Sequence, residues 1–304
     1  MREVFTFHAS RIKSSMHPLK INHQTLSWGE RTYIMGILNA TPDSFSGDGL
    51  YAENAKTVLE QAREFVDAGA DILDVGGEST RPGSAPVDAD EELRRVIPVI
   101  EAISSALPKT LISVDTYKAS VAQVALDAGA HIVNDVWALR ADPELARVVS
   151  AAGCPVILMH NRSNPASVEV REQLGKAYHG AEYDDLLEDI KTELLASVKI
   201  AHQAGVADEA IILDPGIGFG KTVEQNLELN NRLDEIRELG YPVLLGPSRK
   251  SFIGYTLDLP ADQRVEGTAA SIAVGIVRGA DIIRVHDVKE MARIAKMTDA
   301  LVRR

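Results

Sequence analysis

Short apolar runs and longer stretches with helical apolar spacing alternate along the chain, and each run ends at a polar residue. The eight runs are Tyr33–Leu38 ending at Asn39, Ile72–Leu73 at Asp74, Leu111–Val114 at Asp115, Ile132–Val133 at Asn134, Val156–Met159 at His160, Ile211–Leu213 at Asp214, Val243–Leu245 at Ser248–Lys250, and Ile282–Ile283 at Arg284. Such a pattern is typical of parallel strands covered on both faces. Eight units predict an α/β fold, a (β/α)8 TIM barrel, with its chemistry at the carboxyl ends of the strands.

Two regions are expected to differ from the regular barrel. Residues 1–30 are predicted to be a short N-terminal extension, and the loose alternation around Trp28-Gly29 favours a small hairpin that caps the barrel floor. Residues 31–304 then form a single catalytic barrel domain, a usual size for this architecture. Within it, residues 164–184 are a polar insertion without periodicity, expected to be an irregular surface excursion before a helix from about Tyr183 to Ala204.

Composition limits the classes of protein that fit the chain. The net charge of -12 and the lack of a basic stretch argue against nucleic-acid binding. A single cysteine, Cys154, excludes an internal disulfide and is typical of a reducing compartment. No stretch has the length and apolarity of a membrane span, and residues 1–20 lack the apolar core of a signal peptide. We therefore expect a cytoplasmic protein without a membrane partner.

Residues 214–222 contain a glycine-rich segment that resembles a phosphate-binding loop, Asp-Pro-Gly-Ile-Gly-Phe-Gly-Lys-Thr. A phosphate-binding loop requires glycine at the position of Pro215, and a dinucleotide-binding fingerprint requires glycine at the position of Lys221. Both interpretations are therefore disfavoured. The glycines are better explained by a backbone that approaches a flat ligand closely, and Phe219 offers an aromatic face to that ligand.

Three strand-end residues and one lysine form a first candidate site: Asp115, Asn134, Asp214 and Lys250. A single acidic or amide residue at a strand end is often only a helix N-cap, but these would project from different strands toward one cavity. Two carboxylates, an amide and an ammonium can surround a flat heterocycle with adjacent N–H donors and a carbonyl, such as a pterin or a guanine. His160 is interpreted as a core histidine that hydrogen-bonds to backbone.

A second candidate site combines Asn39 from the first strand with Arg284 and His286 from the eighth. These strands are neighbours where the barrel closes, a place where phosphate sites recur. Arginine and histidine can bind an oxyanion, and Asn39 offers an oxygen for Mg²⁺, which takes few protein ligands when a substrate phosphate supplies the others. The Gly-rich loops 40–51 and 76–86 are predicted to be mobile lids over this end of the barrel.

Several of these segments together resemble one known family. Residues 35–46, Met-Gly-Ile-Leu-Asn-Ala-Thr-Pro-Asp-Ser-Phe-Ser, and 76–83, Gly-Gly-Glu-Ser-Thr-Arg-Pro-Gly, resemble the two signatures of the dihydropteroate synthases. Shorter matches lie at residues 113–116, 134–136, 214–221, 248–251 and 284–287. The resemblance covers roughly residues 30 to 300. Asn161, where the family often has methionine, and the long insertion depart from the family pattern.

The resemblance implies condensation of 6-hydroxymethyl-7,8-dihydropterin pyrophosphate with 4-aminobenzoate, giving 7,8-dihydropteroate and pyrophosphate with Mg²⁺ as cofactor. It implies that Asp115, Asn134, Asp214, Lys250, Met159 and Val136 bind the pterin, and that Asn39, Thr80, Arg284 and His286 bind the pyrophosphate, with Asn39 on the metal. It further implies that Thr80, Arg81, Pro82, Phe219, Ser251 and Phe45 frame the aminobenzoate. Asp115, Lys250, Arg284 and His286 would be the catalytic residues.

The resemblance also implies that the reaction follows an SN1-like path and uses no protein nucleophile. It further implies that the protein is a homodimer. Two other functions stay open from the sequence. A pterin-dependent methyltransferase would share the pterin contacts, but it has no use for the pyrophosphate site or for Thr80, Arg81 and Pro82. A non-catalytic pterin-binding relative would have lost part of Asn39, Lys250, Arg284 and His286, all of which are present. A phosphosugar isomerase with the same barrel fold is the least specific alternative.

Overall fold

A computed structural model describes residues 16–40, 51–78, 87–164, 168–171, 174–178 and 182–303. Its main feature is an eight-stranded parallel sheet in the order β10-β7-β6-β5-β4-β3-β12-β11. The strands are β3 (Tyr33–Asn39), β4 (Ile72–Gly76), β5 (Leu111–Asp115), β6 (Ile132–Asp135), β7 (Val156–Met159), β10 (Ile211–Asp214), β11 (Leu244–Leu245) and β12 (Ile282–Val285). A parallel bridge between Leu213 and Val243 joins the two edge strands. The sheet is thus a closed barrel, and the predicted (β/α)8 fold is confirmed.

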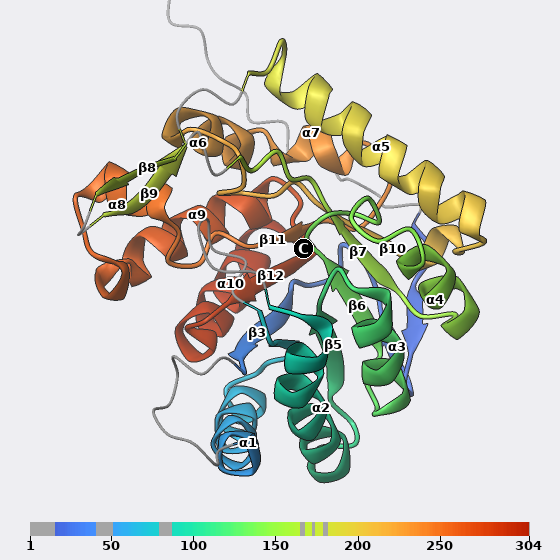
Figure 1. Ribbon diagram of the computed structural model, residues 1–304. Helices are drawn as coiled ribbons and strands as arrows, with labels where there is room; N and C mark the ends of the chain where they lie inside the picture. Colours follow the sequence, from blue (N-terminus) through green and yellow to red (C-terminus); the bar gives the residue numbers. More distant parts are fainter. Residues whose placement is uncertain are drawn as a thin grey trace, which may run out of the picture.

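Helices surround this barrel on its outside (Figure 1). They are α1 (Tyr51–Asp67), α2 (Ala89–Ala106), α3 (Ala119–Asp127), α4 (Leu145–Ala152), α5 (Leu186–Ala204), α6 (Val223–Asn231), α7 (Leu233–Arg237), α8 (Ser251–Leu257), α9 (Val265–Val277) and α10 (Val288–Val302). Short 3-10 turns occupy Asp208–Ala210 and Ala261–Gln263. None of the described helices is both long enough and apolar enough to cross a membrane.

The barrel floor is apolar and is covered by the N-terminal segment. One buried cluster collects an inward side chain from each barrel strand near its amino end: Tyr33, Met35, Ile72, Leu111, Ile132, Ile157, Ile212, Leu244 and Ile282. Leu19, Leu26 and Trp28 pack against the same cluster. They belong to an antiparallel hairpin of β1 (Leu19–Ile21) and β2 (Gln24–Leu26) or follow it directly. The predicted hairpin exists, and it buries the floor of the barrel.

The turn of this hairpin lies elsewhere than the sequence indicated. Its two turn residues are Asn22 and His23, with φ angles of 41° and 62°, rather than Trp28-Gly29. Positive φ at both central residues is the geometry of the two-residue turn that matches strand twist, and asparagine tolerates it well. Trp28 instead follows β2, where its ring packs edge-on against Tyr33 at 5.7 Å between centroids.

The described part of the insertion between β7 and α5 contains a second hairpin, which the sequence analysis did not predict. Strands β8 (Val168–Arg171) and β9 (Gly175–Tyr178) pair antiparallel beside α8 (Figure 1). Between them, the carbonyl of Leu174 accepts a hydrogen bond of 2.9 Å from Nη2 of Arg264. The following helix begins at Leu186 rather than Tyr183, because Asp185 caps it by accepting from the backbone N–H groups of Leu187 and Glu188.

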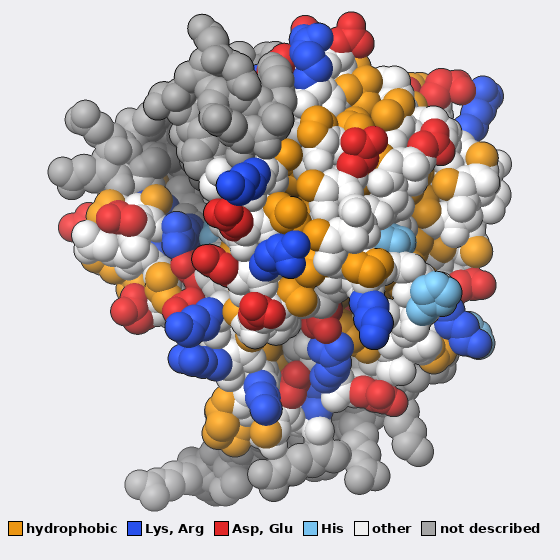
Figure 2. Space-filling view, turned by 90° about the horizontal axis from the view of Figure 1, so that it is seen from below, with side chains coloured by type: hydrophobic (Ala, Val, Ile, Leu, Met, Phe, Trp, Pro, Cys, Tyr) orange, Lys and Arg blue, Asp and Glu red, His pale blue; other side chains and the backbone are white. Residues whose placement is uncertain are grey.

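Charged side chains are distributed over the surface rather than gathered by sign. On the face shown in Figure 2, acidic and basic side chains are interspersed over the described part of the chain. Many form surface pairs within one helix, such as Arg147 with Glu144 at 3.0 Å and Arg232 with Glu235 at 2.7 Å. Exposed pairs of this kind contribute little to stability, so the described surface gives no separate indication of function.

Candidate active site

Polar side chains replace apolar ones inside the barrel, one layer above the floor. Side chains two positions apart on a strand lie on the same face. Thus β4 points Ile72 and then Asp74 inward, and β12 points Ile282 and then Arg284 inward. Asp115, Asn134 and Asp214 occupy equivalent places at the carboxyl ends of β5, β6 and β10, each of them buried. The alternation of strand side chains therefore gathers these polar groups at the end of the barrel where the predicted site lies.

Arg284 joins the two candidate sites into one. Its Nε donates to Oδ2 of Asp74 at 2.6 Å, and its Nη2 donates to Oδ2 of Asp115 at 2.6 Å. Asp74 also accepts from Nδ2 of Asn134 at 3.1 Å. The expected oxyanion-binding arginine is thus held by carboxylates of the expected pterin pocket, and among the described residues its Nη1 has no hydrogen-bond partner.

Asp74 is a site residue that the sequence analysis named as the polar end of the second apolar run but to which it gave no role. It is completely buried, and it contacts both Arg284 and Asn134. One sequence signal pointed to it, because an acidic residue inside a parallel strand interrupts the apolar run, which here continues with Val75. A carboxylate at such a position needs charged or polar partners within the barrel.

Burial and opposite charges determine the protonation of this cluster. Burial raises the pKa of Asp115, while the neighbouring Arg284 guanidinium opposes that rise. Burial lowers the pKa of Arg284, but Asp74 and Asp115 outweigh it and leave the pKa above its ordinary value. Oδ1 of Asp74 and Oδ1 of Asp115 are buried with no partner among the described residues. Such buried acceptors are costly unless a ligand or water donates to them.

Asp214 and Lys250 form a second charged pair close to Arg284. Oδ1 of Asp214 accepts from the backbone N–H of Gly216 at 2.7 Å. The ammonium of Lys250 donates to the carbonyl of Ile217 and lies 4.5 Å from the centroid of the Phe219 ring. Burial raises the pKa of Asp214 and lowers that of Lys250 to about 8, and each opposes the shift of the other. A carboxylate acceptor and a cationic donor therefore lie beside an aromatic face.

The glycine-rich segment after β10 wraps around its own lysine. A side chain at Gly216 would meet the carbonyl oxygen of His160 at 1.9 Å, and its φ of 71° is in the left-handed region, so only glycine fits. Lys221 donates to the carbonyls of Gly216 and Phe219 at 3.0 and 3.1 Å. The lysine thus points into the segment and not toward a phosphate, in agreement with the rejection of a phosphate-binding loop.

His160 contacts side chains, which corrects the expectation that its ring would bond to backbone. Its Nδ1 lies 3.0 Å from Nζ of Lys221, and its Nε2 lies 3.2 Å from Oε2 of Glu193 on α5. Burial lowers the pKa of His160 to about 4, with the Lys221 charge adding to the effect. Asn161, which follows it, donates to the carbonyl of Val136 at 3.1 Å.

His286 and Asn39 lie at the same end of the barrel, at the carboxyl ends of β12 and β3. The hydroxyl of Ser248 accepts from the backbone N–H of His286 at 3.1 Å and lies 3.0 Å from its Nδ1. Asn39 is the exposed last residue of β3 and pairs with Gly76. By strand register it lies a layer beyond His286, whose predecessor Val285 pairs with Gly36.

The remaining predicted contacts are placed only in part. Met159 ends β7 beside Asp214, and Val136 directly follows β6; both are buried. Ser251 is the first residue of α8, next to Lys250. Phe45, Thr80, Arg81 and Pro82 lie outside the described residues, as do residues 41–50 and 79–86 of the two predicted lids.

An ionic cluster fixes residues 76–78, the described start of the predicted lid that follows β4. Lys118 pairs with both Glu78 and Glu92, and the hydroxyl of Tyr117 donates to Glu78 at 3.2 Å. Arg95 donates to the carbonyl of Gly77 at 2.9 Å. Where the chain leaves β4, it is therefore anchored to α2 and to the segment before α3.

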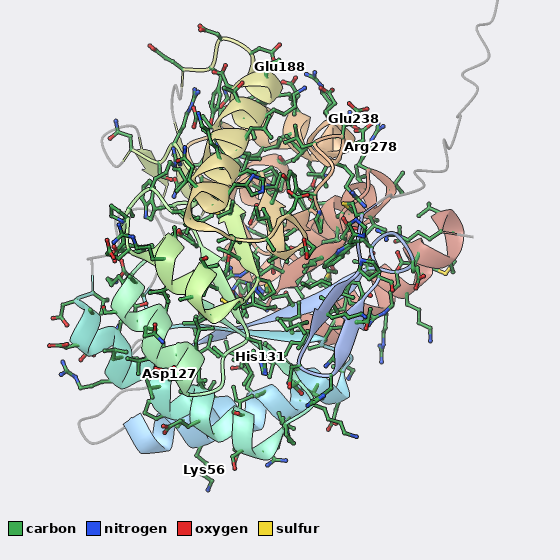
Figure 3. The ribbon with its side chains drawn as sticks, turned by 90° about the vertical axis from the view of Figure 1, so that its right-hand side faces the viewer. Lys56, Asp127, His131, Glu188, Glu238 and Arg278 are labelled. Carbon is green, nitrogen blue, oxygen red and sulfur yellow. The ribbon has the colours of Figure 1, made fainter. Side chains whose placement is uncertain are left out.

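A separate cavity of about 840 Å³ lies at the opposite end of the barrel. Its lining includes Leu19, His131, Pro155 and Ala210, which precede or cover the amino ends of strands, and Asp127 at the end of α3 (Figure 3). Nδ1 of His131 accepts from the backbone N–H of Ile112 at 3.1 Å. Since TIM-barrel chemistry lies at the carboxyl ends, we assign the candidate site to the Arg284 cluster and not to this cavity.

Comparisons with known proteins identify the family of the chain. Residues 35–286 match the family described as pterin binding enzyme. The chain is 50% identical over 287 residues to the dihydropteroate synthase of Clostridium beijerinckii, covering 94% of this chain and 100% of that protein. A dihydropteroate synthase structure from Clostridium difficile in the presence of pteroic acid is similar with a TM-score of 0.83 and 49% identity, covering 91% of this chain and 99% of that chain. A Xanthomonas albilineans dihydropteroate synthase structure with 4-aminobenzoic acid has a TM-score of 0.83 and 38% identity, covering 93% and 97% of the two chains.

Proposed function

Since the chain belongs to the dihydropteroate synthases within the pterin binding enzyme family, we propose that the Arg284 cluster is where it makes dihydropteroate. The enzyme transfers a dihydropterin-methyl group from 6-hydroxymethyl-7,8-dihydropterin pyrophosphate to 4-aminobenzoate and releases pyrophosphate. The observation that carries the assignment is the buried network of Asp74, Asp115, Asn134 and Arg284 facing Asp214 and Lys250. A methyltransferase has no use for an arginine and a histidine prepared for a phosphate.

The pterin is proposed to lie between Asp115 and Asn134 on one side and Asp214 and Lys250 on the other. Oδ1 of Asp115 is a buried acceptor without a partner among the described residues. Asp214 accepts from Gly216 through Oδ1, so its second carboxylate oxygen, Oδ2, can accept from the ligand. Both can accept from ring N–H groups, while the Lys250 ammonium donates to the ring carbonyl. Met159 and Val136 supply apolar surface for the ring.

The pyrophosphate is proposed to lie at the rim, against Nη1 of Arg284 and Nε2 of His286. As the bond from the methylene carbon to the pyrophosphate oxygen breaks, its electron pair leaves with the pyrophosphate, and these donors stabilise the growing negative charge. The methylene cation that results is stabilised by the electron-rich dihydropterin, and the Asp115 carboxylate favours it electrostatically. The amine of 4-aminobenzoate then attacks the methylene carbon and loses a proton.

Mg²⁺ is proposed to enter with the pyrophosphate. The described residues contain no cluster of His, Cys, Asp or Glu that could hold a metal, whereas Asn39 offers one exposed amide oxygen at the end of β3. One protein oxygen fits a Mg²⁺ that takes its other ligands from substrate phosphate and water. When bound, the ion would neutralise charge on the leaving group.

The 4-aminobenzoate is proposed to pack against Phe219 and Ser251. These residues lie beside Lys250, whose ammonium faces the Phe219 ring. Thr80, Arg81, Pro82 and Phe45 are proposed to complete the site, and Thr80 to contact the pyrophosphate as well. Support for this subsite comes from the Xanthomonas albilineans relative described with 4-aminobenzoic acid.

A homodimer is proposed to form through α9 and α10. These neighbouring helices expose a set of large apolar side chains, which are Val274, Val277, Met297, Leu301 and Val302. Exposed apolar groups gathered on adjacent helices are typical of a protein interface.

One assay tests the function, and one variant tests the site. Purified protein with dihydropterin pyrophosphate, 4-aminobenzoate and Mg²⁺ should release dihydropteroate and pyrophosphate. Arg284→Ala should slow the cleavage of pterin pyrophosphate by roughly two to three orders of magnitude, the usual cost of losing a donor to a developing charge. Formation of product by the wild type together with normal cleavage by the variant would remove Arg284 from the mechanism.

A further inference from the structure

Lys221 is a fully buried lysine that the proposed mechanism does not use. Only 1% of its surface is exposed, and its ammonium meets three acceptors: Gly216 O at 3.0 Å, Phe219 O at 3.1 Å and His160 Nδ1 at 3.0 Å. An ammonium has three N–H donors and a neutral amine has two. The protonated lysine alone satisfies all three acceptors.

A chain of contacts leads from this ammonium to the surface helix α5. Because Nδ1 of His160 accepts from Lys221, the ring proton is assigned to Nε2, which lies 3.2 Å from Oε2 of Glu193. Glu193 in turn accepts from Nε of Arg162 at 2.7 Å. Lys221, His160 and Glu193 thus form a relay of contacts through the barrel wall, with a cation at its inner end and a carboxylate at its outer end. The contact between His160 and Glu193 is electrostatic, because it has the distance of an ion pair without the geometry of a hydrogen bond.

The inner end of the relay holds two residues of the proposed substrate sites. Gly216, whose carbonyl accepts from Lys221, donates its own N–H to Asp214 at 2.7 Å. Phe219 is held by its carbonyl, and its ring faces the Lys250 ammonium. Between these two anchors, the N–H of Gly218 donates to Asn226 at 2.6 Å. One buried cation therefore fixes both ends of the segment that carries the pterin and aminobenzoate contacts.

We propose that Lys221 is a positioning residue whose protonated form holds Phe219 in place for the aromatic amine substrate. Glu193, acting through His160, keeps Lys221 in that form. The proposal rests on the proposed function, because it takes Phe219 as part of the 4-aminobenzoate site. It assigns the glycine-rich segment and its terminal lysine a role in substrate affinity, in place of the phosphate binding that its composition resembles.

The charges around Lys221 make this role dependent on pH. Burial lowers the pKa of Lys221 to about 7; Asp214 and Glu193 oppose that shift, while Lys250 and Arg162 add to it. His160 is the remaining titratable contact, and its lowered pKa keeps it neutral near pH 7. As the pH rises through the pKa of Lys221, one of the three acceptors loses its donor. The KM for 4-aminobenzoate should therefore rise above about pH 7.

Glu193→Gln tests the relay without altering any residue that contacts substrate. Its matched control is Glu188→Gln, the same change on the same helix, at an exposed position near the start of α5 (Figure 3). The KM for 4-aminobenzoate and kcat are measured from about pH 6 to about pH 9 at saturating pterin pyrophosphate and Mg²⁺. Titration of Asp115 and Lys250 affects the pH profiles of the wild type, Glu193→Gln and Glu188→Gln equally, because neither residue is changed.

The expected result is a displaced profile for Glu193→Gln alone. Loss of the carboxylate charge lowers the pKa of Lys221, so the rise in KM should begin about one pH unit lower, with kcat near pH 6 unchanged. Glu188→Gln should superimpose on the wild type. Superposition of the Glu193→Gln and Glu188→Gln profiles would overturn the proposal.

Lys221→Met gives a second, independent measurement. Methionine keeps an unbranched side chain and removes every donor, so the KM for 4-aminobenzoate should be raised about tenfold or more, and the rise in KM that follows the pKa of Lys221 should be absent. Thermal unfolding of the variant establishes that it is folded; if it is not, the Glu193→Gln profile decides. A folded variant with the wild-type KM profile would overturn the proposal. Absence of dihydropteroate formation by the wild type would instead overturn the proposed function.

Discussion

The carboxylate of Asp214 illustrates how one residue can serve both the fold and the ligand. One oxygen accepts from the N–H of Gly216 and thereby fixes the start of the glycine-rich segment, while the other is proposed to accept from the ligand. The Lys250 and Arg284 charges, together with that backbone N–H, oppose the rise in its pKa that burial causes. The carboxylate is therefore prepared to accept from two adjacent pterin N–H groups.

Asp214→Asn should weaken the binding of a dihydropterin by about 1.5–3 kcal/mol, the range for hydrogen bonds to charged groups. Asparagine keeps one acceptor, so the contact with Gly216 can persist while the charged ligand contact is lost. Calorimetric titration with a dihydropterin measures the effect directly. An unchanged dissociation constant would show that another residue is the main anchor.

Asp74 is predicted to orient Arg284. Asp74→Asn removes the charge that faces Nε of Arg284 and leaves Asp115 as its remaining carboxylate contact among the described residues. The guanidinium then loses one of two charged hydrogen bonds, which should lower kcat/KM by roughly one to two orders of magnitude. Steady-state kinetics should show this loss in a variant whose urea unfolding confirms a native fold. Wild-type kinetics would mean that Asp115 alone orients the arginine.

The sequence predicted which residues lie at the ends of the strands, but it did not predict which side chains distant in sequence contact each other. Asp115, Asn134, Asp214 and Arg284 were selected from their places at strand ends, and the structure brings them to one end of the barrel. The partners of His160 could not be foreseen, since Lys221 and Glu193 are distant in sequence and meet only through the packing of α5 on the barrel. Asp74 carried a signal, but a single carboxylate within a strand does not reveal its partner.

At the scale of the elements, regular patterns were readable and irregular ones were not. The apolar runs predicted all eight barrel strands, even β11, which has only two residues. The hairpin β8–β9 was missed because its strands have only four residues each, too few for the alternation of Val168 and Val170 with polar residues to stand out. The turn at Asn22-His23 was missed because it contains no glycine.

Helix α6 begins with a capping box that connects the glycine-rich segment to the rest of the barrel. The hydroxyl of Thr222 accepts from the N–H of Gln225 at 3.2 Å, and the Gln225 side chain accepts from the N–H of Thr222 at 2.9 Å. These contacts satisfy two N–H groups at the helix start, which otherwise have no partner within the helix.

Thr222→Ala should lower the free energy of unfolding by about 1 kcal/mol, the typical cost of losing such a cap. The matched control is Thr256→Ala in α8, where the hydroxyl bonds to the carbonyl of Phe252 within the helix and contributes little. Urea unfolding of both variants compares the two positions. Equal effects would show that the capping box does not stabilise α6 beyond an ordinary helical threonine.

At the scale of the whole molecule, the helices α9 and α10 differ from the rest of the ring. Helix α10 has an amphipathic sequence yet exposes Met297 and Leu301, at 60% and 62% of their surface. Helix α9 contributes Val274 and Val277 to the same outer side. A two-fold contact would bring each exposed group against a second copy of the same surface, which is the arrangement of most homodimers.

This proposed interface predicts that one added charge separates the two copies. In a two-fold contact Val274→Asp introduces two like charges into one apolar interface, so burial and mutual repulsion both oppose association. Val124→Asp is the matched control, because Val124 on α3 is exposed to the same 41% as Val274 but lies on a different helix. Light scattering should give twice the chain mass of 32.9 kDa for the wild type and the control, and a mass approaching one chain for Val274→Asp. A wild type with the mass of one chain would contradict the homodimer, and an unaffected Val274→Asp would place its interface on another surface.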